Sequence, residues 1–192
     1  QTASYRIFVA EVASTCNEIL LTRYLLGTTQ DKAQKAYVIN HFLDGMKGTM
    51  FRQTMFAEFE MLAHRMFENG ESLTAERLNQ VYLELNQKYF GPDMVSDPEI
   101  RLEWAKIPHF YTPFYVYQYA TGIAAAAALA TRIQELGEEG VRDYMKFLTG
   151  GGSQDPIDLL KLAGVDMGRK EPVQAAVKLF DEMLGELEEL LA

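Results

Sequence analysis

Apolar residues recur at three- and four-residue intervals along almost the whole chain, the spacing that places them on one face of an α-helix. The clearest such segments are Ile7 to Leu26, Asp31 to Phe67, Thr74 to Tyr89, Glu138 to Leu148 and Glu171 to Leu191. No segment alternates apolar and polar residues for long enough to predict a strand. The pattern therefore predicts an all-α, multi-helix fold, in which Gly45 and Gly48 permit a break in the long second helix.

The most buried helix is expected from about Phe114 to Leu136, because its middle carries small side chains on every face and lets neighbouring helices pack closely around it. The last helix is expected to bury one apolar stripe. That stripe consists of Val173, Val177, Phe180, Leu184, Leu187 and Leu191. With no internal repeat and no shift in composition, residues 1–192 are predicted to form a single helical domain.

Charge and composition exclude several classes of partner. The 192 residues carry 18 Lys and Arg against 27 Asp and Glu, a net charge of −9, which argues against a nucleic-acid partner. The longest apolar stretch, Ile123 to Ala130, is far shorter than the roughly 20 residues that cross a bilayer, so no membrane partner is expected. Cys16 is the only cysteine, which excludes an internal disulfide and fits a reducing compartment.

The three histidines lie in neither of two metal-binding patterns. His-Glu-x-x-His would place two zinc ligands on successive helical turns, and Glu-x-x-His is typical of di-iron bundles, so a ferritin-like oxidase is excluded. Glu60 and His64 are one turn apart and could share a metal, although such a pair is more often a solvated face. His41 carries no stronger signal. The chain is not expected to build a metal site alone.

His109 lies in an unusual aromatic segment between Pro108 and Pro113, and a helix is expected to begin at or just after Pro113. Tyr115 and Tyr119 are four residues apart and share a helical face. This arrangement could direct several hydrogen-bond donors into one cavity. The alternative is an aromatic core whose hydroxyl groups are satisfied internally.

Two glutamates occupy nearly the same face of the first helix. Glu11 and Glu18 are two turns apart, and Glu11 has only apolar neighbours on both sides. A carboxylate buried in such a setting needs a partner. The alternative is a surface glutamate on a helix with a broad apolar face.

Three blocks of this sequence resemble oligoendopeptidase F, the bacterial branch of the thimet-like zinc oligopeptidases. They are Ile7 to Thr15, Ile107 to Gly122, and Gly151 to Met167. The blocks follow the order of that family and span nearly the whole chain. The resemblance implies a mostly helical, zincin-type peptidase with a deep cleft and one zinc ion, in a protein about three times as long.

The resemblance also implies roles for the two glutamates. Glu11 matches the third zinc ligand of the family, and Glu18 matches an acidic residue that supports a zinc-bound histidine by accepting its hydrogen bond. The His-Glu-x-x-His segment would lie upstream of Gln1. The chain is therefore expected to be a C-terminal fragment of the catalytic domain, inactive by itself and partnered by the remainder of the peptidase.

His109 and Tyr119 match the residues that stabilise the oxyanion in this family, whereas Tyr115 and Tyr117 compete for the place of the second tyrosine. The whole protein is expected to be a cytoplasmic zinc endopeptidase that hydrolyses short oligopeptides. The rival hypothesis is a helical interaction module without catalytic activity, in which these residues are structural.

Overall fold

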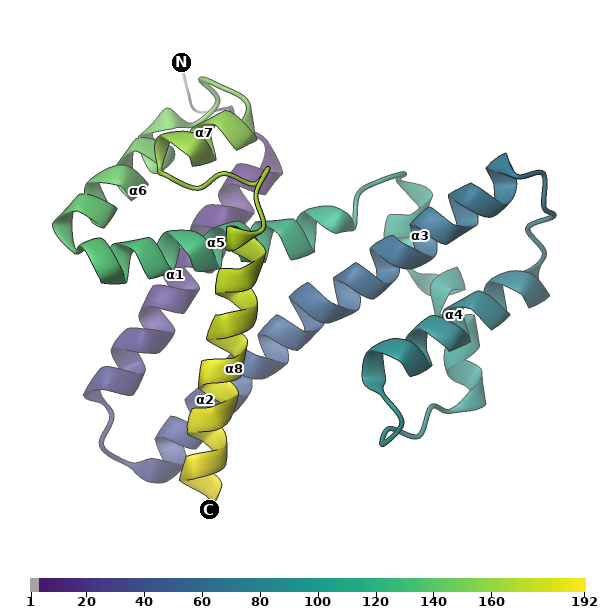
Figure 1. Cartoon of the computed structure of the whole chain (residues 1–192), viewed down its shortest axis with the longest axis horizontal. Helices are drawn as coiled ribbons and strands as arrows, with labels where there is room; N and C mark the ends of the chain where they lie inside the picture. The colour runs from purple at the N-terminus through teal and green to yellow at the C-terminus, as the bar shows by residue number, and fades with distance from the viewer. Residues whose placement is uncertain (1–3) are drawn as a thin grey trace. The chain divides into compact units, whose positions relative to one another are not determined.

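The computed structural model describes residues 4–192, which are helical over most of their length and form no strand (Figure 1). This confirms the all-α prediction. The α-helices are α1 (Ile7–Thr28), α2 (Lys32–Met46), α3 (Arg52–Glu68), α4 (Ala75–Phe90), α5 (Tyr117–Leu136), α6 (Glu138–Gly150), α7 (Pro156–Leu162) and α8 (Glu171–Leu191). Within the described part of the chain, no helix has both the length and the apolar character needed to cross a membrane.

The contacts within the chain divide it into two compact units. The first unit combines the chain up to Lys47 with Thr121–Ala192, and the second unit is Gly48–Ala120. Each unit is described by itself below. The organisation of residues 1–192 as a single domain stays a prediction.

Several helix ends follow the signals read from the sequence. The side chain of Asp31 accepts a hydrogen bond from the Gln34 amide at 2.8 Å, and that of Thr74 accepts one from the Arg77 amide at 3.2 Å. Both are N-cap contacts, which satisfy amides that have no partner within the helix. Helix α1, in contrast, continues one residue beyond Gly27 and ends at Thr28.

The long helix expected from Asp31 to Phe67 is present as two α-helices joined by a π-helical stretch. Helix α2 ends at Met46, the π stretch η1 covers Lys47–Phe51, and α3 follows. The irregularity expected near Gly45 and Gly48 is therefore a widening of the helical turn and not an interruption. Short π stretches of this kind occur mostly as single turns inside α-helices.

The centre of α5 is the core of the first unit, as the sequence predicted. Ala124, Ala125, Ala126 and Ala127 have no exposed surface. At Gly122 an added Cβ would lie 3.7 Å from the ring of Phe8, which shows how closely α1 approaches α5. Helix α8 packs on α2, and α2 on α1 (Figure 1).

The buried face predicted for α8 is wrong. The residues that α8 buries are Pro172, Ala176, Leu179 and Met183, whereas Val173 and Val177 each keep 45% of their surface exposed. Both sets repeat with helical spacing, but they are offset by one residue, which is a rotation of about 100° about the helix axis. The structure selects the set containing Ala176, because a small side chain lets a neighbouring helix come close.

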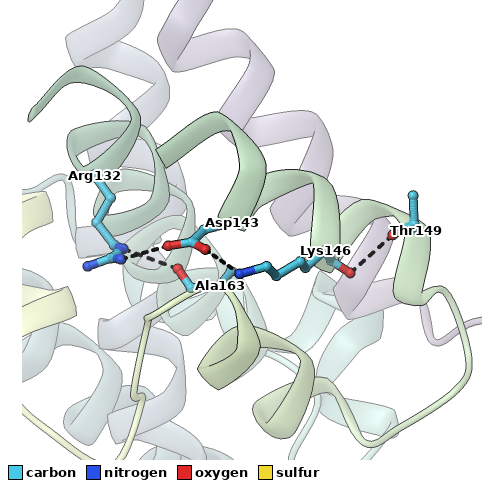
Figure 2. A network of polar contacts seen from close by, with 5 residues as sticks. All are labelled: Arg132, Asp143, Lys146, Thr149 and Ala163. Carbon is cyan, nitrogen blue, oxygen red and sulfur yellow. Dashed lines mark hydrogen bonds and ion pairs between the residues drawn. The ribbon is translucent and has the colours of Figure 1, made fainter. Parts of the chain in front are cut away.

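A polar network joins α5, α6 and the end of α7 within the first unit (Figure 2). The Arg132 guanidinium donates from Nε to the Ala163 carbonyl at 3.1 Å and from Nη2 to the Asp143 carboxylate at 3.1 Å. Lys146 donates to the other Asp143 oxygen at 2.7 Å, and Thr149 donates to the Lys146 carbonyl at 3.5 Å. The contacts of Asp143 with Lys146 and then with Arg132 lower the pKa of its carboxyl group.

The second unit packs α4 on α3 and on the 3-10 helix η2 (Pro98–Lys106). Polar contacts fix η2 in place. The Trp104 indole donates to Asn79 at 2.8 Å, and Tyr82 donates to Glu103 at 2.6 Å. Burial, and then the contact with Glu103, raise the pKa of the Tyr82 hydroxyl. These contacts hold the chain that leads directly to His109.

Candidate active site

The segment that follows η2 is anchored to the core of the second unit by three apolar side chains. Ile107 and Val116 are buried members of that core. Between them, the ring of Phe110 lies 5.6 Å from that of Phe56 and 5.2 Å from that of Phe59. Burial at both ends and in the middle leaves the intervening residues little freedom.

His109, Tyr115 and Tyr119 come together on this segment. His109 lies on the 3-10 helix η3 (Pro108–Tyr111), and Tyr119 lies in the first turn of α5. The Tyr119 hydroxyl and His109 Nε2 are hydrogen-bonded at 3.1 Å. The His109 ring stacks on Tyr115 at 5.5 Å and 20°, and Tyr115 meets Tyr119 edge to face at 5.7 Å and 74°.

Tyr115 reaches this cluster from outside the helix. The prediction that the helix begins near Phe114 is wrong by about one turn, because α5 begins at Tyr117. Tyr115 is stacked on His109, while Tyr117 leaves half of its surface exposed. Of the two tyrosines that compete for the second place, Tyr115 is therefore the one that lies against His109.

The cluster has the chemistry of a hydrogen-bonding site. The three side chains are partly exposed, so a ligand can reach them. An imidazole and a phenol can each donate one hydrogen bond, and the one that they share sets which ring nitrogen of His109 holds the proton. The shared hydrogen bond uses one of these two protons, so the pair can direct the other one to an oxygen on which negative charge develops.

Glu60 adds a residue that the sequence did not single out for this site. Its side chain keeps 8% of its surface exposed, so the expectation of a solvated Glu60–His64 face is wrong for Glu60. The Glu60 carboxylate accepts a hydrogen bond from the Phe114 amide at 2.7 Å. The His64 ring stacks on that of Phe114 at 4.8 Å. The available signal was the presence of the apolar neighbours Phe56 and Phe59 on the same helix.

The two glutamates of α1 lie in different surroundings within the first unit. Glu11 is half-buried, and it forms no hydrogen bond or ion pair with the residues that the structure describes. Glu18 is exposed and accepts a hydrogen bond from Ser14 at 3.2 Å. Their roles at a metal stay predictions.

The donor set of the described residues fits part of a zinc site. Carboxylate oxygen is an ordinary zinc ligand, and Glu11 offers one that is not engaged elsewhere in residues 4–192. The same residues contain no group of three His, Cys, Asp or Glu side chains that could hold a metal ion together. Cys16 is buried, which raises its pKa to about 11 and keeps it a thiol.

Comparison with known proteins places this chain among peptidases. The model of peptidase family M3 matches residues 1–179. Oligopeptidase PepF of Bacillus subtilis (strain 168) is 58% identical over 188 residues, which are 98% of this chain and 28% of that protein. The chromosomal oligoendopeptidase F of Lactococcus lactis subsp. cremoris is 46% identical over 97% of this chain and 31% of that protein.

The fold matches as well as the sequence. The crystal structure of oligoendopeptidase-F from Enterococcus faecium superposes with a TM-score of 0.93 at 50% sequence identity, over 97% of this chain and 36% of that chain. The chain therefore spans 28% to 36% of the length of these three proteins.

Proposed function

The chain belongs to peptidase family M3, and we propose that it is the C-terminal part of the catalytic domain of a longer, cytoplasmic, zinc-dependent endopeptidase that hydrolyses short oligopeptides. Similarity to proteins named oligopeptidase and oligoendopeptidase supports the reaction. The share of those proteins that the chain spans supports the view that further chain completes the enzyme.

The observation that carries this proposal is the hydrogen bond between Tyr119 and His109 at 3.1 Å. Hydrolysis of a peptide bond turns the carbonyl carbon tetrahedral and places a negative charge on its oxygen. Donors already oriented toward that oxygen stabilise the transition state without reorganising during the reaction. The hydrogen bond between His109 and Tyr119 fixes the two side chains relative to each other, and Tyr115 restrains the His109 ring by stacking on it, which supports an oxyanion role for the pair.

Glu11 is proposed to hold the metal together with two histidines from the remainder of the peptidase, and Glu18 to accept a hydrogen bond from one of those histidines. Zinc bound there would polarise the scissile carbonyl and lower the pKa of a bound water. Glu11 suits this role because it is half-buried and unengaged within residues 4–192.

The proposal separates the roles of these residues in the full-length peptidase. Glu11→Ala should lose zinc and activity together, because no neighbouring side chain replaces the missing ligand. His109→Ala and Tyr119→Phe should keep zinc and KM but lower kcat by roughly 10²–10³, the cost of removing one oxyanion donor. Tyr117→Phe is the matched control and should be near neutral.

Metal analysis and steady-state kinetics with a quenched peptide measure all four variants. Full zinc in Glu11→Ala would refute the ligand assignment. Wild-type kcat in both His109→Ala and Tyr119→Phe would refute the oxyanion role. A parent protein that neither binds zinc nor cleaves peptides would instead support the interaction module.

A further inference from the structure

Phe114 has a backbone conformation that a bulky residue rarely adopts. Its φ is 56°, and it is the only non-glycine residue with a positive φ among residues 4–192. A left-handed conformation at such a residue persists only where the surroundings impose it, and it is found preferentially at functional sites. Phe114 immediately precedes Tyr115, whose ring stacks on His109.

Helix α3 imposes this conformation through two side chains one turn apart. The Glu60 carboxylate accepts the hydrogen bond of the Phe114 amide at 2.7 Å, and the His64 ring stacks on the Phe114 ring at 4.8 Å and 27°. Glu60 is almost fully buried, although burial of a carboxylate is costly without a partner. A hydrogen bond to an ionised acceptor is also about twice as strong as a neutral one.

The direction of the chain at Phe114 determines where Tyr115 lies. Val116, two residues later, is fully buried and cannot shift to compensate. If φ of Phe114 changed sign, the bond from Phe114 to Tyr115 would point elsewhere, and the Tyr115 ring would leave His109. The hydrogen bond between Glu60 and Phe114 thus determines whether Tyr115 stacks on His109, although Glu60 takes no part in that stacking.

We propose that Glu60 is a positioning residue of the peptidase site, whose carboxylate holds Phe114 in the left-handed conformation and thereby keeps Tyr115 stacked on His109. This inference rests on the proposed peptidase function. It assigns Glu60 an effect on the chemical step, whereas a buried glutamate with a purely structural role would affect folding stability alone.

The first test uses the full-length peptidase and two replacements of Glu60. Glu60→Ala removes the acceptor and should lower kcat by roughly ten- to a hundredfold, the range expected for loss of a hydrogen bond to a charged group. Zinc content and KM should stay at the wild-type values. Glu60→Gln keeps an acceptor oxygen and should retain kcat within about threefold of wild type.

The second test restores the backbone conformation without Glu60. Glycine adopts positive φ about as readily as negative φ, whereas alanine does not. In the Glu60→Ala background, Phe114→Gly should therefore recover most of the lost kcat, and Phe114→Ala should not. Both replacements remove the aromatic ring, so the comparison isolates the backbone from the stacking on His64.

A third readout does not depend on activity. Hydrogen exchange of the peptide that covers residues 108–119 should become faster in Glu60→Ala and remain at the wild-type rate in Glu60→Gln. The proposal is overturned if Glu60→Ala keeps wild-type kcat, if Glu60→Gln loses as much as Glu60→Ala, or if the glycine and alanine variants behave alike. Should the wild-type protein cleave no peptide, the proposed function fails, while exchange still decides whether Glu60 holds this segment.

Discussion

Two glycines inside helices of the first unit should respond in opposite ways to the same replacement by alanine. Gly122 lies in α5 and Gly140 in α6, and neither has a positive φ. In the interior of a helix, alanine is more favourable than glycine by about 0.5–1 kcal/mol. Gly140 lies in the first turn of α6, where this gain is no larger, so packing decides the sign of the net effect on the free energy of unfolding.

At Gly122 the new Cβ would lie 3.7 Å from the Phe8 ring and 3.9 Å from a methyl group of Val12, which is ordinary van der Waals contact. We therefore expect Gly122→Ala to stabilise the fold by about 0.5–1 kcal/mol. At Gly140 the Cβ would lie 2.5 Å from the Arg132 carbonyl oxygen and 2.7 Å from the Ile133 Cα. Overpacking costs about 1–3 kcal/mol, and these backbone atoms cannot rotate aside, so Gly140→Ala should be destabilising by about 1–2 kcal/mol overall.

Thermal unfolding of the 192-residue chain, followed by circular dichroism, measures both effects. A change of 1 kcal/mol shifts Tm by about 2–4 °C for a chain of this size. Gly122→Ala should raise Tm by about 1–4 °C, and Gly140→Ala should lower it by about 2–8 °C. A Gly140→Ala protein as stable as wild type would refute the close approach of α6 to the end of α5.

Three further predictions concern acid stability, the thiol and the metal. Lys146 and Arg132 lower the pKa of Asp143. The ionised Asp143 carboxylate therefore contributes its full stabilisation above the ordinary Asp pKa, and this stabilisation disappears as pH falls through the lowered pKa. The Asp143→Asn variant should lack this part of the pH dependence when unfolding is followed in an acid titration. Burial raises the pKa of Cys16 to about 11, and a disulfide reagent at pH 8 should react slowly with the folded chain and quickly in denaturant. The isolated chain should bind zinc weakly and cleave no peptide, because one carboxylate is a poor zinc site; tight, stoichiometric zinc in a calorimeter would contradict this.

The sequence predicted most helices because their ends carry local signals, such as the caps at Asp31 and Thr74. It failed where tertiary packing decides. In α8, the larger residues Val173 and Val177 suggested the buried face, but the fold buries Ala176 and Leu179. Both apolar sets repeat with helical spacing, and periodicity alone cannot choose between them.

In the candidate site, too, the sequence predicted what local signals determine and missed what tertiary contacts determine. The spacing of Tyr115 and Tyr119 and the prolines around His109 indicated an aromatic cluster, and the structure brings these three residues together. The sequence paired Glu60 with His64, but it could not predict the hydrogen bond of Glu60 with the Phe114 amide, which lies 54 residues away in sequence. The left-handed conformation of Phe114 has no sequence signal either, since an aromatic residue does not predict it.

The central claim is that His109 and Tyr119 act as one hydrogen-bonding unit at the oxyanion. The most direct measurement is kcat of the full-length peptidase for His109→Ala, Tyr119→Phe and the double variant, at full zinc occupancy. Because the two side chains are hydrogen-bonded to each other at 3.1 Å, replacing either one also disturbs the hydrogen bonding of the other. The double variant should therefore lose much less than the product of the two single losses. Losses that multiply would show that the two residues act independently, and wild-type kcat in all three variants would exclude them from the reaction.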